Sequence, residues 1–219
     1  DLRGLPKVEG ERTKWLPPSW LPSKHDSKGI LLFDELNLAP PMIQASCYQL
    51  ILDRKLGDYR LPDGWLVIGA GNRLEDRANV FEMASPLANR FMHVELAIPT
   101  VEEWTNWGLE KGIDSRIIAF LQFKPSYLFK FDSKSKEKSF PTPRMWEYTS
   151  KLIDGVENQE EIEILVSSAV GEGVAIEFGA FITLQKKVNI SALLDNPETA
   201  ELPQEISMKY SLVSALPEY

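Results

Sequence analysis

The residues best suited to chemistry in this chain are two adjacent carboxylates, Asp34 and Glu35, which follow the apolar run at residues 30–33. An apolar run without polar alternation is typical of a strand buried on both faces of a parallel sheet, and ligands bind beyond the carboxyl ends of such strands. One carboxylate placed there can hold Mg²⁺, while the next orients or deprotonates an attacking water. An acidic pair at a strand end also occurs in turns and helix caps, so that alternative stays open at this point.

A second polar group follows the next apolar run, at residues 65–68, where the chain reads Gly69-Ala70-Gly71-Asn72. The side-chain amide of Asn72 would emerge at the same sheet edge, where it can hydrogen-bond a γ-phosphate or the attacking water. An asparagine that closes a glycine-rich turn is an equally good interpretation. The glycines also suggest a dinucleotide-binding GxGxxG motif, but Leu74 replaces its last glycine and no acidic residue ends a following strand at the right distance.

Two arginines could contact phosphates. Arg90 ends the stretch SPLANR, after a short helix, from where an arginine can reach the nucleotide of a neighbouring subunit. Arg144 lies in the first turn of a helix that we expect to begin at Thr142-Pro143, where free amides and the helix dipole favour an anion. For any single arginine, a surface position without such a role is the commoner outcome.

The pattern of apolar and turn residues predicts a three-layer, parallel-sheet α/β core in residues 1–98 and an all-helical lid domain in residues 99–219. The core would contain three strands separated by helices, the third at residues 91–96, and two hairpins around residues 8–16 and 56–64. Asp114, Thr142 and Asn158 are the expected helix N-caps. The helices are expected at residues 101–111, 114–122, 143–154, 159–170, 174–187 and 204–216.

Composition narrows the classes of function. The net charge of −8 argues against binding the nucleic-acid backbone through bulk charge, so we do not expect nucleic acid as a partner. Cys47 is the only cysteine, which excludes an intrachain disulfide and favours a reducing compartment, so we expect the protein in the cytoplasm. No apolar run approaches the ~20 residues of a membrane span, and HExxH and GxSxG motifs are absent.

Taken in chain order, these features resemble the AAA+ ATPases, and in detail their MoxR-like branch. The matching stretches are GILLFDELNLAP (Walker B), WLVIGAGNR (sensor 1), SPLANRF (arginine finger) and FPTPRMWEY (sensor 2). The opening DLRGLP and a late segment at residues 193–216 are also similar to that branch. The resemblance covers almost the whole chain, and the motifs are specific jointly rather than singly.

The resemblance implies a role for each candidate residue. Asp34 would help to bind Mg²⁺, Glu35 would polarise the attacking water, and Asn72 would sense the γ-phosphate. Arg90 would act on the nucleotide of the adjacent subunit, and Arg144 on that of its own subunit. The cofactors would be ATP and Mg²⁺, and the partners would be further copies in a hexameric ring and a protein client or companion protein. The two hairpins resemble the insertions that contact the client.

The chain departs from the family in one essential element, the P-loop. That motif, GxxxxGK followed by Ser or Thr, needs a lysine directly after a glycine, and this sequence has none. In the family the P-loop precedes DLRGLP, so we expect it upstream of Asp1, in a longer ATPase of which this chain is the C-terminal portion. A shortened paralogue is the second interpretation.

Three expectations follow from the missing P-loop. The chain as given should not hydrolyse ATP. Its sheet should expose an edge and an apolar face, which favours self-association. A non-catalytic AAA+-derived interaction module remains the alternative function. Independently of the P-loop, the acidic net charge disfavours a third function, the remodelling of nucleic acid.

Overall fold

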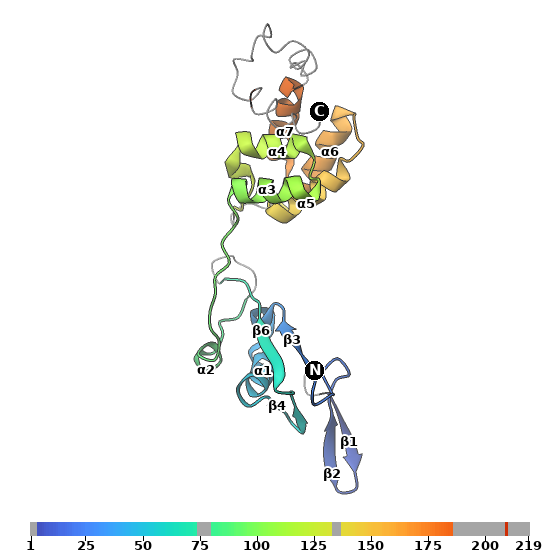
Figure 1. Cartoon of the computed structure of the whole chain (residues 1–219), viewed down its shortest axis with the longest axis vertical. Coiled ribbons are helices and arrows are strands. Elements are labelled where there is room, and N and C mark those ends of the chain that lie inside the picture. Colours follow the sequence, from blue (N-terminus) through green and yellow to red (C-terminus); the bar gives the residue numbers. More distant parts are fainter. Residues whose placement is uncertain (1–3, 74–79, 133–136, 186–208, 210–219) are drawn as a thin grey trace. The chain divides into compact units, whose positions relative to one another are not determined.

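The computed structural model describes residues 4–73, 80–132, 137–185 and 209. Among these residues the protein is a mixed α/β structure with a small parallel sheet and seven α-helices (Figure 1). The chain divides into two compact units, Asp1–Glu95 and Leu96–Tyr219. None of the described helices has the length and apolar content that crossing a bilayer requires.

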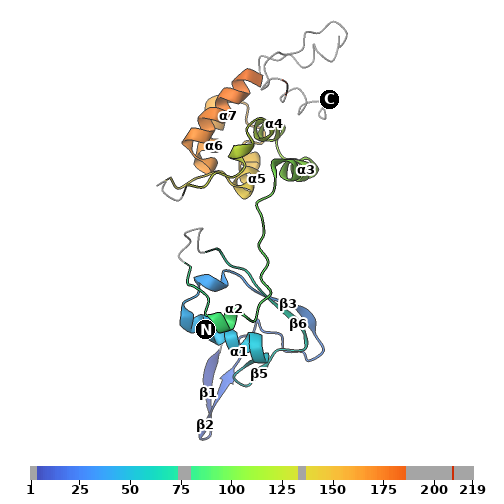
Figure 2. The ribbon, with the colours of Figure 1, turned by 90° about the vertical axis from the view of Figure 1, so that its left-hand side faces the viewer.

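The first unit is built around two parallel strands, β3 (Lys28–Phe33) and β6 (Gly64–Gly69), which confirms the parallel pairing expected from the sequence. Helix α1 (Pro41–Asp53) connects them and begins with Pro41 at its first position. Figure 2 shows β3 and β6 side by side. The buried apolar residues between α1 and one face of the sheet are Leu21, Leu31, Leu50, Leu56 and Leu61.

Both expected hairpins are present in this unit. Strands β1 (Leu5–Glu9) and β2 (Arg12–Leu16) form the first, and β4 (Lys55–Leu56) and β5 (Tyr59–Arg60) form the second. The guanidinium of Arg54 donates to the carbonyls of Pro62 (2.5 Å) and Trp65 (2.8 Å). These two bonds attach the second hairpin to the start of β6, so the hairpin determines the direction in which the chain enters that strand.

The expectation that the strands are buried on both faces is wrong for the described residues. One face of the sheet packs under α1, whereas the side chains on the other face keep 38% to 61% of their surface exposed. These are Ile30, Leu32, Leu66 and Ile68. In register, Ile30 pairs with Leu66 and Leu32 with Ile68. The described residues therefore form two layers rather than three, because no helix among them covers this face. The exposed apolar face expected for a core without its P-loop segment is confirmed, whereas self-association through it remains a prediction.

The prediction of a third strand at residues 91–96 is also wrong, because the segment has no regular structure. Its alternation of apolar side chains is typical of a strand, yet a strand requires a hydrogen-bonded neighbour. Among the described residues β6 pairs only with β3. Met92 and Leu96 accordingly keep 90% of their surface exposed.

The second unit is helical, as expected. Its helices are α3 (Val101–Lys111), α4 (Ser115–Phe123), α5 (Pro143–Leu152), α6 (Gln159–Val170) and α7 (Glu172–Gln185), with the 3₁₀ turn η3 (Pro125–Tyr127). The three predicted N-caps are confirmed, because the side chains of Asp114, Thr142 and Asn158 each accept a hydrogen bond from the main chain of the first turn. The helix expected at residues 204–216 and the late family-like segment lie outside the described residues, Lys209 excepted.

The core of the helical unit is organised by Trp146 on α5, whose side chain is fully buried. Its indole Nε1 donates to the carbonyl of Tyr127 at 2.7 Å. Its ring lies 5.8 Å from that of Phe120 and 6.0 Å from that of Phe178. The tryptophan thus joins α4, α5 and α7 while satisfying its polar atom, which is the usual condition for burying an indole.

We expect Trp146→Ala to lower the free energy of unfolding of the helical unit by about 3–5 kcal/mol, since it leaves a cavity and an unpaired carbonyl. Trp107→Ala on α3 is the matched control, because Trp107 keeps 36% of its surface exposed and should cost much less. Urea denaturation followed by circular dichroism measures both, and equal losses would contradict this account of the core.

Candidate functional site

The carboxyl end of β3 carries one residue more than regular pairing with β6 allows. The N–H of Ala70 donates to the carbonyl of Phe33 (2.8 Å), and its carbonyl accepts from the N–H of Leu36 (2.8 Å). Regular parallel pairing would place these two partners two residues apart, whereas Phe33 and Leu36 are three apart. The chain therefore forms a bulge at Asp34 and Glu35, which protrude from the ladder.

The bulge determines the conformation of Glu35. This residue is left-handed, with φ 52° and ψ 38°, a conformation that costs a non-glycine residue about 1–2 kcal/mol. The N–H of Glu35, which the bulge removes from the ladder, donates instead to Oδ1 of Asp34 at 3.0 Å. Both side chains are exposed, and neither forms an ion pair within the part of the chain that the structure describes.

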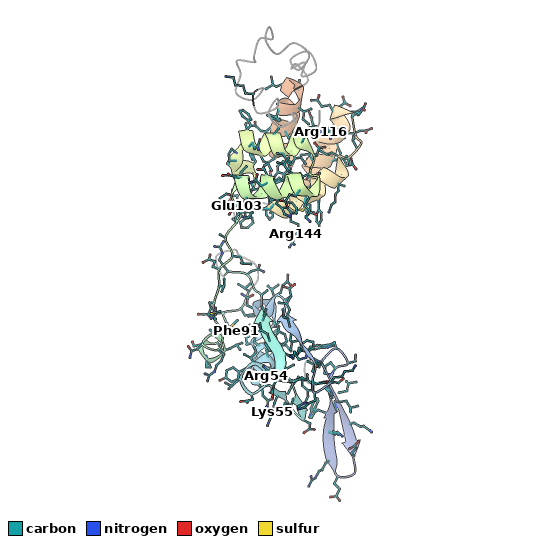
Figure 3. All side chains as sticks on the ribbon, in the orientation of Figure 1. Arg54, Lys55, Phe91, Glu103, Arg116 and Arg144 are labelled. Carbon is teal, nitrogen blue, oxygen red and sulfur yellow. The ribbon has the colours of Figure 1, made fainter. Side chains whose placement is uncertain are left out.

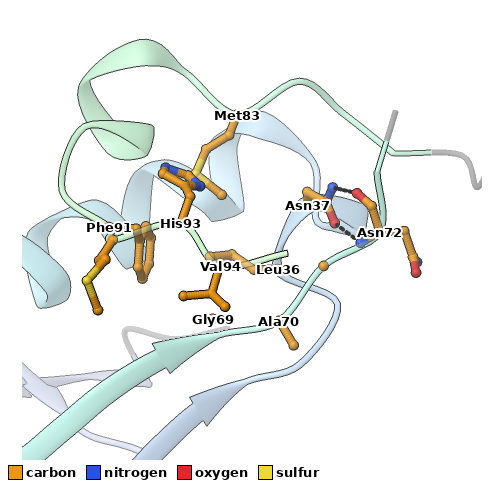
Figure 4. Close-up of a pocket in the computed structure, with 11 residues that line it drawn as sticks. Leu36, Asn37, Gly69, Ala70, Asn72, Met83, Phe91, His93 and Val94 are labelled. Carbon is orange, nitrogen blue, oxygen red and sulfur yellow. Dashed lines mark hydrogen bonds between the residues drawn. The ribbon is translucent and has the colours of Figure 1, made fainter. Parts of the chain in front are cut away.

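Asn72 lies at the same edge of the sheet, two residues beyond Ala70, and is joined to the other strand by Asn37 (Figure 4). The side-chain Nδ2 of Asn37 donates to the main-chain carbonyl of Asn72 at 2.6 Å. The main-chain N–H of Asn72 donates back to Oδ1 of Asn37 at 3.2 Å. Asn37 belongs to the short 3₁₀ helix η1 (Leu36–Leu38), which begins directly after Glu35. The acidic pair and Asn72 thus follow neighbouring strands at the same edge of the sheet, and Asn37 joins the segments that carry them.

The glycines of this edge have a structural explanation. A Cβ at Gly71 would lie 2.5 Å from Oδ1 of Asn37, which is closer than carbon and oxygen can approach. A Cβ at Gly69 would lie 3.1 Å from Cδ2 of Leu36. The run Gly69-Ala70-Gly71 therefore allows the two chain segments to approach each other, in agreement with the rejection of a dinucleotide-binding motif.

A small cavity of about 220 Å³ opens beside Asn72. Its wall combines polar groups with apolar side chains, and the apolar ones that Figure 4 labels include Leu36, Met83, Phe91 and Val94. The ring of His93 also lines it, and its Nε2 donates to the carbonyl of Ala88 at 2.8 Å. This bond gives His93 a structural role in the first unit.

The two candidate arginines belong to different units of the chain. Arg90 follows α2 (Ser85–Ala88), and its main-chain N–H donates to the carbonyl of Leu87 at 3.0 Å. Arg144 occupies the second position of α5, at the surface of the helical unit (Figure 3). Both side chains are exposed. Within the first unit, the structure records no hydrogen bond or ion pair between Arg90 and the acidic pair. The expected short helix before Arg90 and the helix start before Arg144 are confirmed.

The chemistry of these residues fits a magnesium–nucleotide only in part. Mg²⁺ is commonly held by one or two carboxylates together with substrate phosphates and waters, and Asp34 can supply the carboxylate. Groups of three or more acidic, histidine or cysteine side chains able to hold a metal by themselves are absent from the described residues. Retention of the ion would therefore depend on phosphate oxygens, for which this sequence offers no P-loop.

Cys47 takes no part in this site. Its side chain is buried on α1, and burial raises the pKa of the thiol. A raised pKa leaves less of the nucleophilic thiolate at neutral pH, so Cys47 is a packing residue of the first unit.

A scan against protein-family models found no match to this chain, and searches of curated proteins and of solved structures found none either. The functional argument therefore depends on the residues and their geometry. Sequence reasoning missed two features of that geometry, the bulge and the role of Asn37. The only local signals for them are the Asn that follows Asp-Glu by two residues and the glycine directly before Asn72.

Because Glu35 is left-handed, we expect Glu35→Gly to give a more stable first unit than Glu35→Ala, by about 1 kcal/mol. Glycine should instead destabilise the unit at Ala45, an exposed position within α1. We expect Ala45→Gly to lower the free energy of unfolding by about 1 kcal/mol. Hydrogen exchange of the β3 and β6 amides reports the stability of this unit for all three variants. If Glu35→Gly were less stable than Glu35→Ala, the strained bulge would be contradicted.

Proposed function

We propose that this chain is part of a ring-forming ATPase of the MoxR-like AAA+ branch, which couples ATP hydrolysis to the remodelling or maturation of a protein client. The single observation that carries the proposal is the placement of Glu35 and Asn72. They follow the carboxyl ends of the adjacent parallel strands β3 and β6, and the main-chain bonds at Ala70 join the two segments that carry them. A carboxylate beside a polar amide at this edge is what activating a water against a γ-phosphate requires.

The roles of the other residues follow from the same proposal. Asp34 would hold Mg²⁺, which supplies Lewis-acid polarisation of the phosphate when it is bound. Glu35 would orient and polarise the attacking water, and Asn72 would hydrogen-bond the γ-phosphate or that water. Arg90 would complete the site of the neighbouring subunit, and Arg144 would contact the nucleotide of its own subunit from the first turn of α5.

The uncovered parts of the first unit support a longer parent protein. The exposed apolar face of the sheet and the unpaired segment at residues 91–96 are the surfaces that additional strands and a P-loop helix would cover. In such a parent the cofactors are ATP and Mg²⁺, the protein is cytoplasmic, and the subunits form a hexameric ring. The exposed hairpin β1–β2 would face the protein client or a companion protein.

The alternative is a non-catalytic interaction module derived from the same fold. The observation that favours it is the lack of any glycine followed by lysine, which leaves the acidic edge without a phosphate cradle. The residues encoded before Asp1 separate the two, because a P-loop within ~100 residues upstream favours the motor. In either case we expect the 219-residue chain by itself not to hydrolyse ATP.

In the parent ATPase, Glu35→Gln should keep nucleotide affinity and abolish turnover, because the amide cannot polarise the water. Arg90→Ala should also abolish turnover without loss of affinity. A one-to-one mixture of these two variants should restore turnover, since about a quarter of random ring interfaces would join an intact Glu35 to an intact Arg90. Phosphate release and the binding of a fluorescent nucleotide measure both properties.

The matched control mixture combines Glu35→Gln with Arg144→Ala. Arg144 is proposed to act on the nucleotide of its own subunit, so no subunit of this mixture holds a complete site and turnover should stay absent. Glu110→Gln, on the exposed side of α3, should have no effect. Turnover that survives Glu35→Gln would overturn the proposed function, and a first mixture without activity would overturn the role of Arg90.

A further inference from the structure

At the edge of the sheet, the side-chain amide of Asn37 takes the place of a main-chain hydrogen-bonding partner. Beyond the bulge, the chain after β3 turns into η1 and can no longer pair with the chain after β6. The next residue whose main chain faces this side is Asn72, two positions after Ala70. Both of its main-chain groups bond to the side-chain amide of Asn37, at 2.6 Å and 3.2 Å.

We propose that Asn37 is a positioning residue for the hydrolytic step, and that it sets the distance between Asn72 and Glu35. This inference rests on the proposed function. Asn37 lies two residues after Glu35 on one side of the site and bonds to the main chain of Asn72 on the other. It is therefore the side chain that joins the segment carrying the water-polarising carboxylate to the main chain of the phosphate-sensing residue, one step beyond the main-chain bond between Leu36 and Ala70.

The chemistry of the amide explains why asparagine is required. Asn37 must donate through Nδ2 and accept through Oδ1 at the same time, and among short side chains only an amide does both in this geometry. An aspartate has the same shape and can still accept from the N–H of Asn72. It cannot donate, however, and it would place a carboxylate oxygen against the carbonyl of Asn72.

The connection leaves the functional group of Asn72 available. Its main-chain N–H and carbonyl are both used by Asn37, whereas its side-chain amide forms no hydrogen bond with any residue that the structure describes. The main chain is fixed and the side chain is free to bind. The main chain of Asn37 is fixed as well, because its carbonyl accepts from the N–H of Phe81 at 2.8 Å.

The first test uses the 219-residue chain and asks whether the connection exists in solution. We expect Asn37→Ala to accelerate hydrogen exchange of the Asn72 amide about tenfold, since its acceptor is removed. Asn37→Asp should protect that amide better than Asn37→Ala does, because the carboxylate still accepts. Asn106→Ala, on the exposed side of α3, should leave the Asn72 amide unchanged. Equal exchange in wild type and Asn37→Ala would overturn the inference.

The second test uses the parent ATPase and asks whether the connection matters for chemistry. We expect Asn37→Asp to lower kcat by about 10–100-fold while nucleotide affinity stays within about twofold, because a small displacement of Asn72 affects the reacting geometry rather than binding. Asn106→Asp is the matched control, with the same chemical change away from the site, and should be as active as wild type.

The outcomes separate the inference from the proposed function. Wild-type kcat in Asn37→Asp, with Glu35→Gln inactive, would overturn the inference and leave the proposed function intact. Parallel losses of kcat, nucleotide affinity and melting temperature would overturn it as well, since they would mark Asn37 as a merely structural residue. Turnover that persists in Glu35→Gln would overturn the proposed function, and the positioning role with it.

Discussion

The proposed chemistry depends on a short series of hydrogen bonds beyond the carboxyl ends of β3 and β6. The main chain of Ala70 bonds to Phe33 and Leu36, and the main chain of Asn72 bonds to the side chain of Asn37. Between Phe33 and Leu36 the chain has one residue too many for regular pairing with Ala70, so it must bulge. The acidic pair protrudes because of that constraint, and Glu35 accepts a strained backbone conformation as its consequence.

Local features of the fold could be predicted from the sequence, and non-local ones could not. The caps at Asp114, Thr142 and Asn158 and the turns of both hairpins depend on residues within a few positions, and the structure confirms them. The strand expected at residues 91–96 has apolar alternation but needs a neighbour that its own residues do not specify. The same limit applies to the burial of β3, whose exposed face would need a covering layer that the described residues lack.

In the candidate site, too, some features could be predicted from the sequence and others could not. The proximity of Asp34, Glu35 and Asn72 followed from the rule that parallel strands end at a common edge. The bulge did not follow, because nothing in the sequence near Glu35 reports that Leu36 rather than Glu35 bonds to Ala70. Asn37 was missed because its partner is thirty-five residues away. The sequence names the groups that could react, whereas the pairing of the two strands determines how they are held.

The central claim is that a magnesium–nucleotide binds at this edge of the sheet. Iron-mediated cleavage tests it most directly, because Fe²⁺ can replace Mg²⁺ and generate radicals that cut the nearby main chain. In the parent ATPase we predict ATP-dependent cuts near Asp34 and near Asn72, which Asp34→Asn abolishes. Cuts at other positions only, or cuts at this edge that do not depend on ATP, would contradict the account.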